Sequence, residues 1–399
     1  MKTLDGGVTA PKGFRAAGVR CGIKQSGPDL MLLTSDSPAV AAGMFTTNAV
    51  KSAGVILSRE RVDEGVARAI IANSGNANAC TGEQGMRDAE RMTELVASAM
   101  RFDNDEVLIA STGIIGQHLP MDKIEAGIAE AVAALSVEGG EVAAEAIMTT
   151  DTRPKKIAVE AEIGGATVRI GGMCKGVGMI APNMATMLAF ITTDAKMTPR
   201  ALRQCLAKSA GESFNCVTVD GDMSTNDSVF ILANGAAENT IIDTAGPDLE
   251  AFQAALDTVC VHLAREIARD GEGATKLVEI RVNGAESPED AKKMAMTIAN
   301  SPLVKTAIFG EDPNWGRVLC AAGRSGALVI PEKTSLYFGD VKIVEYGEPL
   351  KLDPEAARKP MLEHDLVITV DLGVGSESAT AFTCDFSYDY VKINAEYHT

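Results

Sequence analysis

The sequence predicts a mixed α/β protein whose sheets and helices stack in layers. Three observations favour this class. Short apolar runs of strand length alternate with segments of helical periodicity. Strands outnumber clean strand–helix–strand units, and several form apparent hairpins, which disfavours a purely parallel doubly wound sheet. The chain has 399 residues, enough for two domains or one large composite core.

The first half of the chain alternates between strand and helix patterns. Residues 84–101 bring Met92 and Val96 to one face at helical spacing, and a similar stripe predicts a helix over 121–135. Residues 156–169 alternate apolar and polar side chains around a Gly-Gly turn, which predicts a hairpin. Strands are expected at 54–57, 69–72, 107–110 and 187–191, with loops at 111–113 and 171–178.

The second half repeats the mixture, without a fixed-period repeat or a low-complexity linker. Helices are expected at 198–210, 247–269 and 287–299. Strands are expected near 215–219, 228–233, 276–282, 335–345, 366–371 and 379–386.

Composition and charge exclude several classes of function. The 37 basic and 54 acidic residues give a net charge of −17, which argues against binding nucleic acid or an anionic membrane, because both need a basic face. No apolar stretch is long enough to span a bilayer, and the N-terminal residues lack an apolar signal core. We therefore expect a cytoplasmic enzyme.

The cysteines and histidines do not form a metal-binding pattern. The eight cysteines contain no C-x-x-C pair, and the four histidines show no H-x-x-x-H spacing. We expect the cysteines to be small buried hydrophobic residues and expect neither a metal nor a cofactor. A zinc hydrolase or a histidine-based triad is disfavoured, so catalysis must use other groups.

Five polar, glycine-rich segments stand out from the periodic background. One such segment alone is usually a turn, but ligand sites gather on loops at strand ends, so five together suggest a site. Lys175 lies among glycines but is followed by Gly176, so the phosphate-loop pattern is absent and nucleotide binding is not expected. The segments are 73–78, 111–113, 149–152, 172–179 and 270–276.

The most informative stretch is 175–190, in which a glycine-rich loop leads into an apolar strand headed by Thr186. A threonine at this position is ordinarily a β-branched strand residue. The preceding Ala185 is small and leaves its carbonyl accessible. If the bond between Ala185 and Thr186 were cut, Thr186 would carry both a hydroxyl and a free α-amine that can act as its base. This chemistry needs no histidine.

Long motifs make the chain recognisable. It closely resembles the bifunctional ornithine acetyltransferase/glutamate N-acetyltransferase family of arginine biosynthesis over essentially its whole length. The resemblance is carried by Gly7–Phe14, Asn73–Gly82, Ser111–Gly116, Met148–Thr152, Lys175–Phe190, Asp312–Arg317 and Asn394–Thr399.

This resemblance implies a self-cleaving precursor, cut between Ala185 and Thr186 into an α chain (1–185) and a β chain (186–399). Thr186 would be the nucleophile that moves acetyl from N2-acetylornithine to glutamate, and Thr112 and Gly113 would form the oxyanion hole. The implied fold is an α/β/β/α sandwich resembling that of N-terminal-nucleophile hydrolases, assembled as a dimer of αβ pairs (α2β2). The implied substrate contacts are Thr149, Lys175, Thr186, Glu272, Asn394 and Thr399.

Alternatives remain at the sequence level. A related self-processing enzyme could use the same Thr186 to hydrolyse an amide, because transfer and hydrolysis share the acyl-enzyme. A non-enzymatic amino-acid sensor is a second alternative, and it predicts one uncut chain. The matched motifs also do not decide whether acetyl-CoA serves as an additional acetyl donor.

Overall fold

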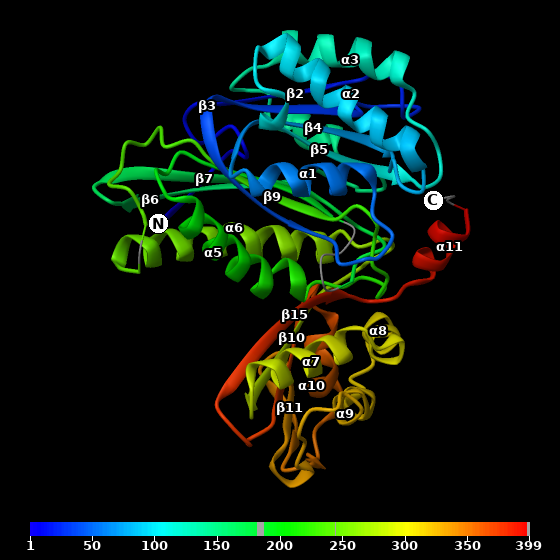
Figure 1. Ribbon diagram of the computed structural model, residues 1–399. Coiled ribbons are helices and arrows are strands. Elements are labelled where there is room, and N and C mark those ends of the chain that lie inside the picture. Colours follow the sequence, from blue (N-terminus) through cyan, green and yellow to red (C-terminus); the bar gives the residue numbers. More distant parts are fainter. Residues whose placement is uncertain (182–186, 244, 397–399) are drawn as a thin grey trace.

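A computed structural model describes residues 1–181, 187–243 and 245–396 (Figure 1). Among these residues, nine strands form one hydrogen-bonded sheet in the order β1-β6-β7-β8-β9-β3-β4-β5, with β2 paired to β3. The strands are β1 (Lys2–Leu4), β2 (Phe14–Val19), β3 (Leu30–Phe45), β4 (Val66–Asn76), β5 (Val107–Ile114), β6 (Lys155–Ile163), β7 (Ala166–Lys175), β8 (Leu188–Thr193) and β9 (Ser228–Ala233).

The long strand β3 connects two layers of this sheet. Its first half pairs with β2 and β4, its second half pairs with β9, and the register to β4 shifts between Thr34 and Ala39. A register shift of this kind bends a strand. One continuous strand thereby belongs to both layers.

Alternation along the strands gives each layer two apolar faces. Leu33 of β3 and Ile70 of β4 join an inner core with Phe190 of β8 and Phe230 of β9, whose rings stack 5.9 Å apart. Side chains on the outer faces of the two layers pack against helices instead, because successive residues of a strand face opposite sides. The predicted α/β/β/α sandwich is therefore confirmed.

Helices cover both outer faces of the sandwich (Figure 1). α1 (Ala53–Asp63), α2 (Gly82–Met100) and α3 (Met121–Ala134) pack on the β3–β4–β5 side, and α5 (Pro199–Glu212) and α6 (Pro247–Arg269) pack on the β7–β8–β9 side. The short α4 (Gly140–Ala146) contacts β2 and contributes to the inner core. Thr198 caps α5 by accepting a hydrogen bond from the Ala201 N–H, with Pro199 at the first helical position.

A second sheet follows in the sequence and has its own core. Its described strands are β10 (Leu277–Ala285), β11 (Ser335–Phe338), β12 (Val341–Glu345), β13 (Glu348–Pro349), β14 (Asp365–Asp371) and β15 (Glu377–Cys384), in the order β13-β12-β11-β14-β10-β15. Its helices are α7 (Pro288–Ala299), α8 (Pro302–Phe309), α9 (Trp315–Gly323) and α10 (Pro354–Arg358). From β15 the chain returns to the edge of the sandwich as α11 (Tyr388–Glu396) (Figure 1).

Two predicted strands are wrong. Residues 54–57 lie in helix α1, which begins where the Ser52 side chain accepts a hydrogen bond from the Val55 N–H. The buried face of this helix includes the polar Ser58 and Arg61, while Ile56 is exposed, so the apolar residues alone show no helical period. Residues 215–219 form a 3₁₀ turn (Phe214–Cys216) and an isolated bridge from Val217 to Phe382.

The expected loops and buried cysteines need smaller corrections. Residues 111–113 belong to strand β5, and β7 continues to Lys175, so these polar segments are strand ends. Five of the eight cysteines are buried, Cys21 is half-buried, and Cys80 and Cys320 are exposed. In the part of the chain that the structure describes, no helix combines the length and apolar composition needed to cross a membrane.

Candidate active site

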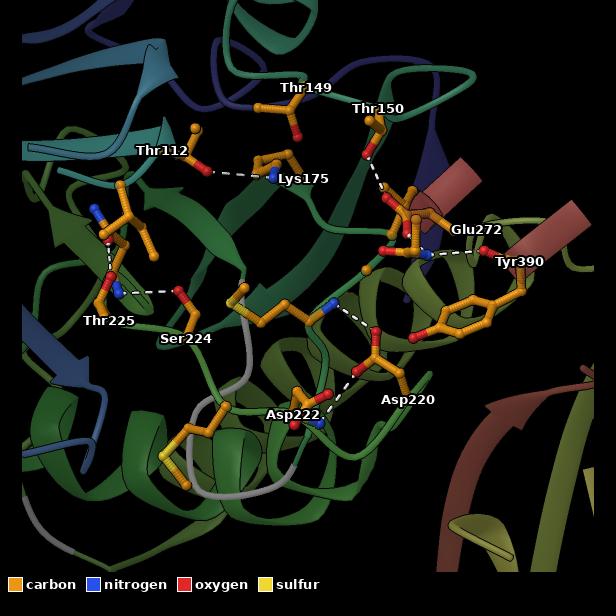
Figure 2. A pocket seen from close by; sticks show the side chains of 18 residues that line it. Thr112, Thr149, Thr150, Lys175, Asp220, Asp222, Ser224, Thr225, Glu272 and Tyr390 are labelled. Atoms are coloured by element: carbon orange, nitrogen blue, oxygen red, sulfur yellow. Dashed lines mark hydrogen bonds between the residues drawn. The ribbon is translucent and has the colours of Figure 1, made fainter. Parts of the chain in front are cut away.

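A pocket of about 300 Å³ opens where the ends of β5 and β7 meet the loops around residues 150, 222 and 272 (Figure 2). It collects residues from both halves of the sequence. Six of the predicted site residues line it: Thr112, Gly113, Thr149, Lys175, Glu272 and Asn394. The remaining three, Ala185, Thr186 and Thr399, lie outside the described residues.

Strand β8 begins beside this pocket. Met187, the first described residue after Thr186, donates its N–H to Asp227 Oδ1 at 3.0 Å and accepts a hydrogen bond from the Ser228 N–H at 3.1 Å. The next residue, Leu188, pairs with Lys175 of β7. The chain that follows Thr186 is therefore fixed against a strand that supplies a pocket residue.

Thr112 and Gly113 are held by a close approach of two parallel strand ends. Gly113 of β5 is opposite Gly75 of β4. Its φ is +134°, and a Cβ there would lie 2.3 Å from the Gly75 carbonyl carbon. Only glycine fits both conditions. The Asn226 side chain, which donates to the Ser111 carbonyl at 2.7 Å, fixes the residue before Thr112.

Lys175 is the buried cation of the pocket, with 3% of its surface exposed. Its Nζ donates to Thr112 Oγ1 at 3.3 Å, and in Figure 2 the two side chains point toward one another. Within the described residues it has no ion pair. Burial lowers the pKa of Lys175, and the charge of Asp151 opposes this change.

Glu272 is the anion on the other side of the pocket. Its carboxylate accepts hydrogen bonds from Thr150 Oγ1 at 2.9 Å and from Asn394 Nδ2 at 2.8 Å. It also contacts the backbone of Gly178, where a Cβ would lie 2.5 Å from Glu272 Oε2. Helix α11 is thereby connected to the sandwich through Asn394.

A buried ion network lies next to the pocket without lining it. Lys155 Nζ is 2.6 Å from Asp151 Oδ1 and 2.5 Å from Asp270 Oδ2. The Thr152 hydroxyl also donates to Asp270. Asp151 further accepts the N–H groups of Thr149 at 3.0 Å and of Gly176 at 2.9 Å.

Sequence reasoning missed one side of the pocket. The loop from Asp220 to Asn226 contributes Asp220, Asp222, Met223, Ser224, Thr225 and Asn226 to the lining. Asp220 accepts the N–H groups of Met179 at 2.6 Å and Ile180 at 2.9 Å. Burial raises its pKa. This loop is itself a polar, glycine-containing segment before a strand, so the criterion that singled out the five segments would also have found it.

Asp227 is a second functional candidate that the sequence did not single out. It is fully buried, and its Oδ2 has no hydrogen-bond partner among the described residues. Burial raises its pKa well above the usual value.

Two other features of the sequence do not contribute to the pocket. The motif 312–317 lies beside the second sheet, where Asn314 caps α9 by accepting the Arg317 N–H and Trp315 packs on the core of that sheet. The described residues contain no cluster of histidine, cysteine and carboxylate side chains that could hold a metal ion.

Comparisons with known proteins agree with this architecture. The ArgJ family model matches residues 15–399. The arginine biosynthesis bifunctional protein ArgJ of Symbiobacterium thermophilum is 55% identical over 402 residues, with 100% of each chain covered. The protein of that name from a Synechococcus strain is 50% identical over 99% of this chain and 98% of its own. The crystal structure of ArgJ from Bacillus halodurans is 44% identical with a TM-score of 0.51, covering 52% of this chain and 98% of the solved chain. The chain therefore belongs to the ArgJ family of arginine biosynthesis.

Proposed function

We propose that the protein transfers an acetyl group from N2-acetyl-L-ornithine to L-glutamate through an acetyl-enzyme on Thr186. One observation carries this proposal. The described pocket gathers Thr112, Gly113, Lys175 and Glu272 from distant parts of the sequence, beside the strand that directly follows Thr186. Glutamate N-acetyltransferase activity agrees with the family to which the chain belongs.

Self-cleavage would create the nucleophile. The Thr186 hydroxyl attacks the Ala185 carbonyl, the peptide bond breaks as an ester forms, and water hydrolyses the ester. The products are an α chain of residues 1–185 and a β chain of residues 186–399. The solved Bacillus halodurans chain is matched over 98% of its length by 52% of this chain, so it is about as long as one cleavage product. Two αβ pairs would form the α2β2 enzyme.

The free α-amine of Thr186 then accepts the proton of its own hydroxyl. The oxygen attacks the acetyl carbonyl of N2-acetylornithine, and ornithine leaves as its amine takes the proton. The α-amine of glutamate next attacks the acetyl carbonyl of acetyl-Thr186. The bond from the acetyl carbon to the Thr186 oxygen breaks, the proton of the glutamate amine passes through the Thr186 α-amine to that oxygen, and N-acetylglutamate leaves. No metal or cofactor takes part in these steps.

Thr112 and Gly113 would stabilise the oxyanion of each step. A lysine ammonium has donors but no acceptor, so Thr112 Oγ1 must accept the hydrogen bond from Lys175. The Thr112 hydroxyl hydrogen is then free to donate to the oxyanion, together with the Gly113 N–H. Each such donor typically contributes about 3–4 kcal/mol to transition-state stabilisation.

The two charged side chains suit the two substrates. Lys175 has no anion within ion-pair distance in the described residues, so it can bind the α-carboxylate that both substrates carry. Glu272 can bind the side-chain ammonium of N2-acetylornithine. Asn394 and Thr149 are neutral neighbours that accept either substrate, and Thr399 would be a further contact. We expect these reactions to take place in the cytoplasm.

Intact mass spectrometry and a half-reaction assay test the proposal. Purified protein should contain two polypeptides, the second beginning at Thr186, and N2-acetylornithine alone should add one acetyl group to the β chain. Glutamate should then remove it. Thr186→Ala should remain one chain and be inactive, whereas a full-length wild-type chain with undiminished activity would contradict the mechanism.

The same assay separates the alternatives. Free acetate released from N2-acetylornithine without glutamate would indicate a hydrolase, and an uncut, inactive wild-type chain that binds amino acids would indicate a sensor. Acetyl-CoA in place of N2-acetylornithine decides whether that donor is used.

A further inference from the structure

The buried ion network beside the pocket has a balanced set of charges. Asp151 and Asp270 are the anions, and Lys155 lies between them with its side chain fully buried. Lys175 is the second buried cation of the region. Two buried lysines therefore face two buried aspartates, and removal of one member leaves an uncompensated charge.

Asp151 occupies the central position in this set. Its Oδ1 accepts hydrogen bonds from Lys155 Nζ and from the Gly176 N–H, and its Oδ2 accepts the Thr149 N–H. Gly176 directly follows Lys175, so one carboxylate connects the two segments that present Thr149 and Lys175 to the pocket. Asp151 itself does not line the pocket.

Asp151 is a carboxyl group whose pKa lies below its usual value. Burial alone would raise this pKa, but the charges of Lys155 and Lys175, together with the hydrogen bonds from Lys155 and from the Gly176 N–H, lower it to about 2.

The charged groups that face Lys175 differ in their ability to keep it charged. They include Asp151, Lys155, Glu272 and Asp227, and the half-buried Lys24 is a further cation that interacts with Lys175. Lys155 disfavours a second cation. Burial raises the pKa of Asp227 well above its usual value, which favours the neutral form of this carboxyl. Glu272 is already hydrogen-bonded to two donors across the pocket. Asp151 is the first and largest of the groups that oppose the effect of burial on Lys175.

We propose that Asp151 is a positioning residue of the transferase: its carboxylate fixes the two segments that present Lys175 and Thr149 to the pocket and places a negative charge beside Lys175. The inference rests on the proposed role of Lys175 as the partner of the substrate carboxylate. Asp151 acts through Lys175 and does not touch the substrate.

The variant Asp151→Asn tests this role, because it removes the charge with little change in shape. Loss of a nearby anion lowers the pKa of Lys175, so Lys175 loses its proton at a lower pH. The alkaline limb of kcat/KM for N2-acetylornithine, which reports groups of the free enzyme, should move to lower pH by about one unit or more. KM should rise for both substrates.

Asp270→Asn is the matched control. Asp270 is buried in the same network and binds the same Lys155, but the N–H groups of Thr149 and Gly176 donate to Asp151 and not to Asp270. This variant should move the alkaline limb less than Asp151→Asn does. An unmoved limb in Asp151→Asn, or an equal displacement in both variants, would overturn the proposal. Cleavage of each variant is verified by intact mass and its folding by circular dichroism.

A second variant gives a test of opposite sign if Asp151→Asn does not fold. Lys155 lowers the pKa of Lys175, so Lys155→Met should move the alkaline limb to higher pH. A limb that stays in place or moves down contradicts the proposal. Absence of acetyl transfer in the wild-type protein would instead reject the proposed function, which keeps the two failures distinguishable.

Discussion

Glu272 is the anion of the pocket, and both of its hydrogen-bond donors are neutral side chains. The side-chain ammonium of N2-acetylornithine can therefore form an ion pair with Glu272. Glu272→Gln should slow acetylation of the β chain by N2-acetylornithine about tenfold, as expected for loss of a charged hydrogen bond. Removal of the acetyl group by glutamate should change less, because glutamate has no side-chain ammonium. Rapid-quench mass spectrometry measures each half-reaction, and equal losses in both would contradict this assignment.

The raised pKa of Asp227 predicts how the free energy of unfolding depends on pH. Its raised pKa means that the folded protein retains a proton that the unfolded chain has already released. The stability therefore falls as pH rises from the unfolded pKa toward the folded one. Asp227→Asn has no such proton and keeps an acceptor for the Met187 N–H.

This variant should gain stability over its parent by about 1.4 kcal/mol per pH unit within that window. Both proteins should carry Thr186→Ala, so that a single chain unfolds. Denaturant titrations from pH 5 to pH 8 measure the difference. A difference that is constant with pH would show that Asp227 does not hold a proton.

Among the elements, helix α11 combines few stabilising contacts with a place in the pocket. None of its residues is buried, yet Tyr390 and Asn394 line the pocket. A chain that ends at Ser387 should therefore melt within a few degrees of the full chain. Its KM for N2-acetylornithine should rise at least about tenfold, because Glu272, the proposed partner of the substrate ammonium, loses a hydrogen bond. Asn394→Ala is the control for that single bond, and an unchanged KM in the truncated chain would show that α11 is dispensable.

Some helices and strands could be predicted from the sequence more accurately than others. Helix 247–269 and strand 228–233 have the predicted bounds, because the helix has a regular apolar period and the strand is a short apolar run that ends at Asn234-Gly235. Strand β3 was missed because polar residues at 34–37 interrupt its apolar pattern where the register shifts. Helix α1 was misread as a strand since packing, not amphipathicity, decides its conformation.

The site could be predicted only partly, for a physical reason. The motifs give residues such as Thr112 and Lys175, but they do not give the close approach of Gly113 to Gly75 or the placement of Asp227 against Met187. Such contacts join residues far apart in the sequence. The roles of Thr186 and its cleavage remain predictions.

At the scale of the whole molecule, the two proposed chains are interleaved in one sheet. Strands β8 and β9 would belong to the β chain, yet they lie between β7 and β3 of the α chain. Ladders on both sides, from β7 to β8 and from β9 to β3, would hold the cleaved chains together.

The cleaved chains should therefore elute as one species in size-exclusion chromatography and separate only in denaturant. After denaturation, the uncut Thr186→Ala chain should refold in much higher yield than the mixed wild-type fragments, since an intact chain avoids the cost of bringing two molecules together. Equal refolding yields would show that the two fragments fold and pair as readily as the intact chain, which would contradict this expectation.

The return of the chain from the second sheet to the pocket has a consequence for protein synthesis. Asn394, which binds Glu272, lies on α11, which follows every described strand of both sheets. A polypeptide released too early contains every strand of the sandwich but an incomplete pocket. A product that ends before Tyr388 should therefore fold and yet bind substrate poorly, so loss of this helix would be detected by substrate affinity before it is detected by stability.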